Sequence, residues 1–194
     1  MITQTTQIHS SDDELIKAIS GGDRNAMRLL YARHSVRIFR FAMRIVSDES
    51  VAEDVVNEVF LDVWRKAGGF EGRSQVSTWL LAITRFKALA MGRRRPLDPL
   101  DDEVCETIED GADDPETVMG KRQTSSLLFR CLEKLSPAHR EIIDLVYYHD
   151  KAVDEVAEII QVPRNTVKTR MFYARNHLAK LLAEARLDRD LLAA

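Results

Sequence analysis

A segment close to the C-terminus carries basic side chains and no acidic ones. Residues 164–182 contain Arg164, Lys168, Arg170, Arg175 and Lys180, although the net charge of the whole chain is −3. Lysine and arginine side chains bind phosphate oxygens, and a helix that carries them can enter the major groove of DNA. The net charge of the whole chain argues against binding to nucleic acid. The local charge of this segment instead predicts such binding.

This segment has two distinct faces when its residues are placed on a helix at about 100° per residue. The apolar face consists of Val167, Met171, Ala174, Leu178 and Leu181. The opposite face consists of Asn165, Lys168, Thr169, Phe172, Tyr173 and Asn176. An exposed phenylalanine is costly unless something covers it, and a base edge or a thymine methyl group could do so. Side chains nearer the flanks suit phosphate contacts, and they are Arg164, Arg170 and Arg175. A solvated basic helix in a bundle is the alternative.

The residues before this segment complete a helix-turn-helix pattern. One apolar face of a short helix is formed by Val153, Val156, Ala157 and Ile160. The tight connection at 161–163 ends in Pro163, which prevents the first helix from continuing. The next helix then begins at Arg164 or Asn165, so the sequence predicts a DNA-binding helix-turn-helix.

The other elements that the sequence predicts are also helices. Ser11 to Glu14 has the pattern of a capping box that opens a short helix, and Gly21-Gly22 ends that helix. Longer amphipathic or capped segments follow. We expect helices at 24–46, 50–67, 76–93, 120–134, 137–148, 152–160 and 164–185. With no alternating β-branched runs, the expected fold class is all-α.

The charge and proline pattern divides the chain into two small helical domains. Residues 96–118 contain three prolines and many acids with little periodicity, which is typical of a flexible linker. The expected divisions are an N-terminal tail and short helix at 1–23, a helical domain at 24–95, an acidic linker at 96–119, a helix-turn-helix domain at 120–185 and a C-terminal tail at 186–194.

Several functional classes are disfavoured by the composition. No apolar run approaches the roughly 18 residues of a membrane span, and the N-terminus lacks the pattern of a signal peptide, so we expect a cytoplasmic protein without membrane insertion. Cys105 and Cys131 form no metal-ligand pattern and fit a reducing compartment. No nucleophile, base and orienting group stand at a recognisable spacing, so we expect no catalytic residues, no cofactor and no metal.

The chain contains LSPAHREIIDLVYY at 135–148 and VDEVAEIIQVPRNTVKTRMFYARNHL at 153–178. These two segments resemble the fourth conserved region of bacterial RNA polymerase sigma factors. The second conserved region is similar to AEDVVNEVFLDVWRKAGGFEG (52–72) and STWLLAITR (77–85). A short chain with only these two domains is similar to the extracytoplasmic-function (ECF) group. The resemblance implies a non-catalytic protein that binds core RNA polymerase and promoter DNA and is restrained by an anti-sigma factor.

The resemblance also implies roles for individual residues. The C-terminal domain would read the minus-thirty-five element with Arg164, Asn165, Lys168, Thr169, Arg170, Phe172, Tyr173 and Arg175. The N-terminal domain would open the minus-ten element with Phe70, Arg73, Ser74, Trp79, Arg85, Lys87, Arg93 and Arg94. For Trp79, packing beneath a base pocket is as plausible as touching DNA.

A third expected surface lies on the helix predicted at 50–67. Its buried stripe is formed by Val51, Ala52, Val55, Val56, Val59 and Val63. The opposite side, with Asp54, Asn57, Glu58 and Leu61, is acidic with an exposed leucine. The resemblance implies that it docks on the clamp coiled coil of the largest polymerase subunit. Two positions depart from many relatives, which have glutamine at Asn57 and asparagine at Phe86.

Two functions of other classes compete with this interpretation. A DNA-binding regulator that works without polymerase would need a receiver or ligand-binding domain, and the N-terminal half has no strand pattern to build one. An adaptor that binds another regulator through acidic and apolar helix faces would not need the acid-free helix at 164–182. An enzyme is the least supported class.

Overall fold

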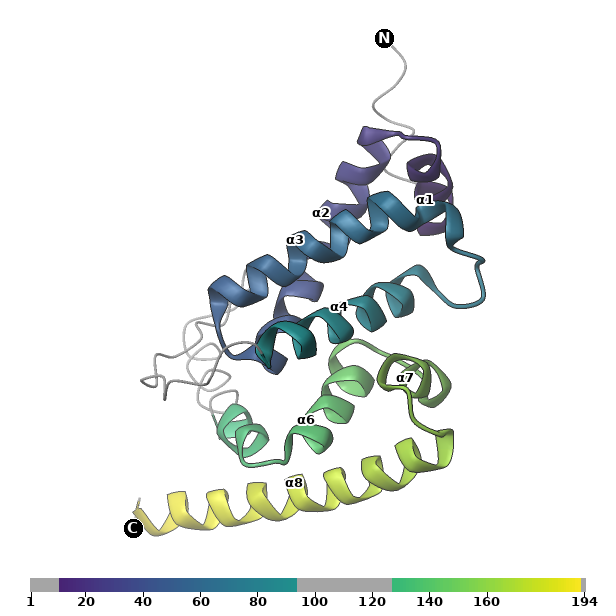
Figure 1. Ribbon diagram of the computed structural model, residues 1–194. Coiled ribbons are helices and arrows are strands. Elements are labelled where there is room, and N and C mark those ends of the chain that lie inside the picture. Colours follow the sequence, from purple (N-terminus) through teal and green to yellow (C-terminus); the bar gives the residue numbers. More distant parts are fainter. Residues whose placement is uncertain (1–10, 94–126, 193–194) are drawn as a thin grey trace. The chain divides into compact units, whose positions relative to one another are not determined.

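The computed structural model describes residues 11–93 and 127–192, with side chains up to residue 185. Every regular element in these ranges is helical (Figure 1). The elements are α1 (Asp12–Ser20), α2 (Arg24–Val46), α3 (Glu49–Lys66), η2 (Ala67–Gly69), α4 (Val76–Gly92), α6 (Pro137–Ile143), η3 (Asp144–Tyr148), α7 (Val153–Ile160) and α8 (Arg164–Leu192), and residues 127–133 are helical as well. The all-α prediction is confirmed. The predicted acidic linker, with Cys105, lies outside the described residues.

The described residues form two compact units. One consists of residues up to Arg93 together with Asp144–Val167, and the other of residues 127–143 and those from Lys168 onward. One boundary falls at the start of the linker predicted at 96–119, but Asp144–Val167, with η3 and α7, group with the N-terminal helices, and α7 packs against α4. Their local hydrophobic period predicts which faces are buried, but it says nothing about which helices cover those faces.

The first unit is built around α2, α3 and α4, which pack against one another (Figure 1). The stripe predicted on α3 is buried throughout, and Val55, Val59 and Val63 have no exposed surface. Asp48 caps this helix by accepting a hydrogen bond from the Val51 N–H at 2.9 Å, because the first turn of a helix has no internal partners for its N–H groups. The helix ends at Lys66 and is followed by η2, which contains Gly68 and Gly69.

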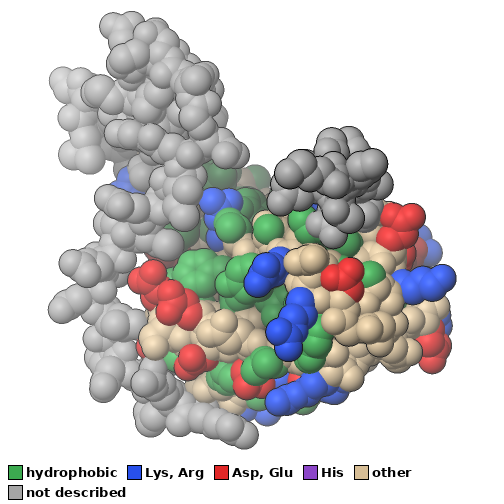
Figure 2. Space-filling view, turned by 90° about the horizontal axis from the view of Figure 1, so that it is seen from above, with side chains coloured by type: hydrophobic (Ala, Val, Ile, Leu, Met, Phe, Trp, Pro, Cys, Tyr) green, Lys and Arg blue, Asp and Glu red, His purple; other side chains and the backbone are tan. Residues whose placement is uncertain are grey.

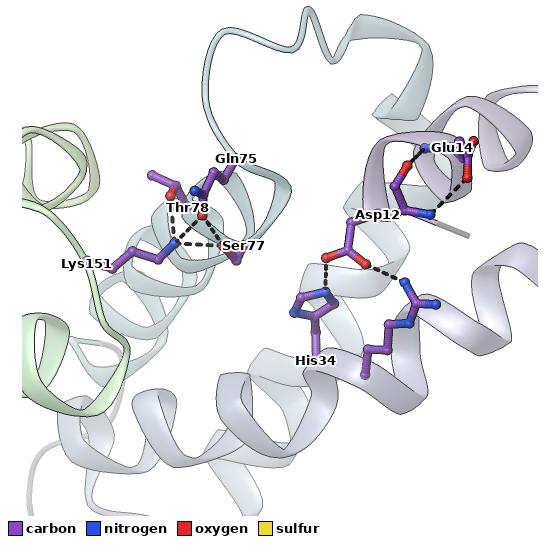
Figure 3. A network of polar contacts seen from close by, with 9 residues as sticks. Asp12, Glu14, His34, Gln75, Ser77, Thr78 and Lys151 are labelled. Carbon is purple, nitrogen blue, oxygen red and sulfur yellow. Dashed lines mark hydrogen bonds and ion pairs between the residues drawn. The ribbon is translucent and has the colours of Figure 1, made fainter. Parts of the chain in front are cut away.

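Helix α1 is tied to α2 by one carboxylate. The predicted capping box is present, with the Ser11 and Glu14 side chains each accepting a backbone N–H (Figure 3). Asp12 in the same turn lies 2.7 Å from His34 Nε2 and 2.9 Å from Arg33 Nη1. His34 is thus a hydrogen-bonded side chain of the fold.

The start of α4 is held by a buried ammonium group. Lys151 is only 6% exposed, and its Nζ donates to Gln75, Ser77 and Thr78 at 3.2, 2.7 and 3.0 Å (Figure 3). Glu155 completes the set at 3.0 Å. Burial alone would raise the pKa of Glu155, but hydrogen bonds from Thr78, the Ala152 N–H and Lys151 bring that pKa below its usual value. A charge this buried is tolerated because every donor has an acceptor.

The second unit buries a small core between α8 and the stretch at 132–143, which includes α6. Leu135, Ile143 and Ala174 are at its centre. Cys131 is also buried, as a free thiol. Two boundaries differ from the prediction: the helix expected at 137–148 continues after Ile143 as the wider turn η3, and α8 runs to Leu192 instead of ending near 185.

Candidate functional surfaces

The first half of α8 presents the face that the sequence predicts for DNA. Phe172 and Tyr173 are 60% and 57% exposed, and their rings meet edge to face with centroids 5.5 Å apart. Asn165, Lys168 and Thr169 are exposed as well. Val167 and Ala174 on the opposite side are fully buried. Both predicted faces of this helix are therefore confirmed, and the outer one combines aromatic, amide, hydroxyl and cationic groups.

The turn before α8 fixes where this helix begins. Gln161 ends α7 in the left-handed conformation at φ 55°, which its own side chain supports by donating to the Glu158 carbonyl at 2.6 Å. The Pro163 carbonyl then accepts from the N–H groups of Thr166 and Val167. Neither α8 nor this turn carries an acidic residue before Glu184. The nearest acidic partner of Arg164 is Asp154 on α7, at 3.1 Å, with both side chains more than half exposed.

The exposed face of α3 adjoins an apolar hollow shared with α2. Asp54 and Asn57 are exposed, and Leu61 is 45% exposed. The hollow is lined by Arg24, Met27, Asn57, Phe60, Leu61 and Trp64. Trp64, 38% exposed, was not predicted for this surface, although its position three residues after Leu61 places it on the same side of the helix. Figure 2 shows one face of the molecule, where hydrophobic side chains reach the surface among basic and acidic ones.

Glu58, one of the residues predicted to dock core polymerase, forms an ion pair with Lys87 of the same unit, and its side chain is 42% exposed. Its Oε2 lies 3.0 Å from Lys87 Nζ, and Asp62 Oδ2 lies 3.2 Å from the same atom. Burial opposes the charged form of Lys87, but the hydrogen bonds to these two carboxylates raise its pKa above the usual value. The hydrogen bond from Lys66 is the main reason that the pKa of Asp62 is lowered. Lys87, predicted to hold a phosphate, thus joins α4 to α3.

An aromatic pair stands where the sequence predicts a base pocket. Phe70 and Trp79 have ring centroids 5.0 Å apart and pack against the core of the first unit. A shallow hollow beside them is lined by Asp62, Lys66, Gly69, Trp79 and Ile83. Trp79 therefore both packs and faces a surface hollow, so the two alternatives for this residue do not exclude each other.

The remaining residues predicted for the minus-ten element are spread around α4. Arg73 in the preceding loop forms an exposed ion pair with Glu71, and Ser74 is partly buried. Arg85 is partly buried and Arg93 is exposed at the end of the helix. Arg94 lies outside the described residues. The structure brings Phe70 and Trp79 together, and Lys87 binds Asp62, which lines the hollow beside Trp79. Arg85 does not line that hollow.

The described residues contain no helix that is long and apolar enough to cross a membrane. They also contain no group of three acidic, histidine or cysteine side chains positioned to hold a metal ion.

Comparisons with known proteins agree with this all-helical fold. The models for Sigma-70 region 2 and Sigma-70 region 4 match residues 30–96 and 131–180. RNA polymerase sigma-H factor from Pseudomonas aeruginosa is 30% identical over 94% of this chain and 96% of its own length. ECF RNA polymerase sigma-E factor from Escherichia coli is 31% identical over 85% of this chain and 91% of its own length.

Two solved structures share the fold. CnrH in complex with the cytosolic domain of CnrY has a TM-score of 0.65 at 23% identity, covering 90% of this chain and 99% of that one. RpoE in complex with the anti-sigma factor NepR from Bartonella quintana has a TM-score of 0.62 at 23% identity, covering 79% and 94%. Together the fold and its surfaces define a transcription initiation factor rather than a simple DNA-binding module. The chain belongs to the sigma-70 family of RNA polymerase sigma factors, in its extracytoplasmic-function group.

Proposed function

We propose that this sigma factor divides its work among three surfaces: α8 for the upstream promoter element, the start of α4 with its preceding loop for promoter opening, and α3 for core polymerase. The observation that supports this division most strongly is the outer face of α8. It is exposed, basic and aromatic on a helix whose first five turns carry no acid. A protein-docking adaptor has no need of such a face, whereas a reader of DNA does.

In this proposal the side chains at the centre of the outer face read bases in the minus-thirty-five element. Lys168 and Thr169 supply hydrogen-bonding groups for base edges, and Phe172 and Tyr173 supply apolar contact, for example with a thymine methyl group. The flanking residues, Arg164, Arg170 and Arg175, hold phosphates and set the register of the helix. Asn165 completes the face at the N-terminal end, where a recognition helix approaches the groove.

Promoter opening is assigned to the first unit. An unpaired minus-ten base needs an aromatic or shaped pocket once it leaves the stack. The hollow beside Phe70 and Trp79 offers an aromatic wall, and it is also lined by Lys66 and Asp62, which pair with each other at 2.9 Å. Arg73 and Ser74 lie in the loop that precedes α4, and Arg93 and Arg94 follow its end. Arg85 contacts a phosphate in this proposal, whereas Lys87 stabilises the fold by pairing with Glu58 and Asp62.

Core polymerase docks on α3 in this proposal. Asp54, Asn57 and Leu61 form an acidic face with an apolar centre, which suits a basic partner helix. The adjoining hollow with Trp64 extends the apolar part of this surface. Glu58 contributes charge near its edge but is held by Lys87.

The same exposed surfaces need to be occluded by a partner when the protein is not bound to polymerase. The solved relatives include a sigma factor bound to an anti-sigma factor, and we expect an anti-sigma protein to restrain this chain in the cytoplasm. The chain itself carries out no catalysis and needs no cofactor, since polymerase supplies the chemistry.

The proposal is tested by run-off transcription with purified core polymerase on fragments of the source genome. We expect discrete transcripts only when the chain is added, and their start sites give the promoter sequence. Core polymerase that transcribes no fragment with the chain present would contradict the proposal. Tight, specific binding of the chain to promoter duplex without core polymerase would favour the regulator alternative.

A further inference from the structure

The segment at 144–167 belongs to the second sigma region but packs with the first. The Sigma-70 region 4 model matches residues 131–180, whereas Asp144–Val167 groups with the N-terminal helices. The buried hydrophobic core of those helices extends from Leu15 to Ala88, and among the described residues it includes none from 144–167. The segment is therefore attached to a core that is complete without it.

Buried polar side chains gather where this segment meets α2 and α4. Of the five buried polar or charged side chains in the described residues, four lie at this contact, namely Thr78, Asp144, His149 and Lys151. Asp144 pairs with Arg44 of α2, and Lys151 donates to the start of α4 (Figure 3). A permanent core gains little from such charges, since apolar side chains of similar size often stabilise it as well or better. Polar contacts of this kind suit an interface that opens and closes.

The attachment limits how far the upstream-reading face of α8 can lie from α4. Lys151 touches Thr78, and the chain from Lys151 to Phe172 spans at most about 50 Å between Cα atoms, whatever the direction of α8. The minus-ten and minus-thirty-five elements are centred about 25 base pairs apart, which is about 85 Å of a duplex that is stiff on this scale. A chain with this contact in place therefore cannot read both elements at once.

A buried imidazole lies within the contact. The side chain of His149 is 2% exposed, and its ring meets Phe41 of α2 and the adjacent Tyr148 edge to face, with centroids 5.3 and 5.1 Å apart. Its Nε2 is buried without a hydrogen-bond partner in the described structure. The ring is thus packed as a neutral group, and a proton on it would be poorly solvated.

The charges around this ring also disfavour a proton on it. They belong to Arg37 and Arg44 on α2 and to Asp144, Asp150 and Lys151 in the segment itself. Asp144 is paired with Arg44, and Lys151 with Glu155 on α7. Burial is the main cause that lowers the pKa of His149 to about 4, and the nearby cations lower it further. A protonated His149 therefore loosens the contact.

We propose that Asp144–Ile160 is an acid-sensitive latch, which holds the free chain closed on α2 and α4 and is released when His149 takes up a proton. The released ring is hydrated and titrates near its ordinary pKa of 6.5, so between about pH 6.5 and pH 4 the released form binds a proton that the latched form does not. Release is therefore favoured as pH falls through that window. This inference rests on the proposed function, since release matters because it frees the chain to reach both promoter elements.

Energy transfer between two dyes on the full chain measures release. The dyes are attached at Lys17→Cys on α1 and Glu158→Cys on α7, both exposed positions, after Cys105 and Cys131 are replaced by alanine. From pH 7.5 to pH 5.5 the ratio of released to latched chain should rise about tenfold, because the pKa of His149 is about 4 in one form and 6.5 in the other.

Three further variants of this dye-labelled chain make the measurement specific. His149→Gln should abolish the response to pH, whereas His177→Gln, at an exposed position on α8, should leave it within about twofold of the wild type. Lys151→Met removes the ammonium bound at the start of α4. It should therefore raise the released fraction at pH 7.5 and bring the tenfold response into a measurable range.

The latch is overturned if pH changes energy transfer in neither the wild type nor Lys151→Met, if His149→Gln keeps the response, or if circular dichroism shows that helix is lost together with energy transfer. In a second arm at pH 7.5, core polymerase and DNA with both promoter elements should lower energy transfer. Transcription that starts with energy transfer unchanged would also overturn the latch. Failure of the proposed function would differ, because no transcript would form although the free chain still responded to acid.

Discussion

Two of the cations predicted to hold phosphates differ in how firmly the protein itself engages them. Arg164 pairs with Asp154 at the surface, where the side chains are 58% and 67% exposed, and such pairs contribute at most about 1 kcal/mol. Lys87 is 15% exposed and pairs with two carboxylates. A phosphate can replace Asp154 at little cost, whereas drawing Lys87 outward would break its pairs with Glu58 and Asp62 and leave Asp62 with Lys66 alone.

We expect Arg164→Ala to weaken binding of the holoenzyme to all upstream elements by a similar factor, because a phosphate contact carries no sequence information. The slope of log affinity against log salt concentration should fall by about one. Fluorescence anisotropy of labelled promoter duplex over a potassium chloride series measures both. Asp154→Asn is the control and should keep the wild-type slope; a wild-type slope in Arg164→Ala would remove this residue from the phosphate contacts.

At the scale of elements, α3 and α4 each serve the core on one side and a functional surface on the other. The two are joined by the ion pairs of Lys87, and the start of α4 is fixed by Lys151. This arrangement holds the loop before α4 in place, since Gln75 and Ser77 are bound at the point where the loop becomes helix.

Charge reversal on α3 tests the docking surface. Asp54→Arg places a cation where a basic partner helix is expected, so binding to core polymerase should weaken by at least about tenfold, which is about 1.4 kcal/mol. Asp13→Arg on α1 is the control, and circular dichroism checks that both variants remain folded. Glu58→Arg is less suitable because it would also break the pair with Lys87. Full co-purification of Asp54→Arg with core polymerase would place the docking surface elsewhere.

The buried ammonium should be important for stability. Lys151→Met removes the partner of Glu155 in a largely buried pair, and we expect the free energy of unfolding to fall by about 3 kcal/mol. Urea denaturation followed by tryptophan fluorescence reports on this unit, because Trp64 and Trp79 both belong to it. Lys180→Met, at a 75% exposed side chain, is the control. Adding Glu155→Gln should recover part of the loss; no difference between Lys151→Met and the control would show that the network contributes nothing.

At the scale of the whole molecule, residues far apart in sequence combine in one core. Asp144 and His149 are buried against α2, where Arg44 pairs with Asp144 and the ring of Phe41 meets His149 edge to face. Burial is the main cause that lowers the pKa of His149 to about 4, and the positive charges of Arg44, Arg37 and Lys151 lower it further. The Asp144 carboxylate pairs with Arg44 and also lies 3.5 Å from His149 Nε2, but burial and the surrounding positive charges keep the histidine neutral.

This neutral histidine makes the stability depend on pH. Between about pH 6.5 and pH 4 the unfolded chain binds a proton at His149 that the folded chain does not, so stability falls as pH falls through that window. From pH 7 to pH 5 the wild type should lose about 2 kcal/mol more than His149→Gln. Urea denaturation at both pH values measures the difference. Equal losses in the two proteins would mean that His149 already titrates in the folded state near its ordinary pKa.

The sequence by itself was sufficient for the helices and their faces. The buried stripe of α3, the two faces of α8 and the capping box at Ser11 follow from hydrophobic period and local hydrogen-bonding chemistry, which act within a few residues. The acid-free stretch of α8 and the order of the motifs also identified the family. The roles of single residues in binding DNA and polymerase stay predictions.

Only the tertiary structure decided which partner each face meets. Lys87 and Glu58, predicted for DNA and polymerase, pair with each other because α3 and α4 pack side by side. Lys151 and His149 gave no signal in the sequence, and both are buried against helices far away along the chain. Phe86 is left exposed by the same packing. The charge and hydrophobicity of a side chain determine which surroundings stabilise it. Only long-range packing determines whether solvent, another helix or a ligand provides those surroundings.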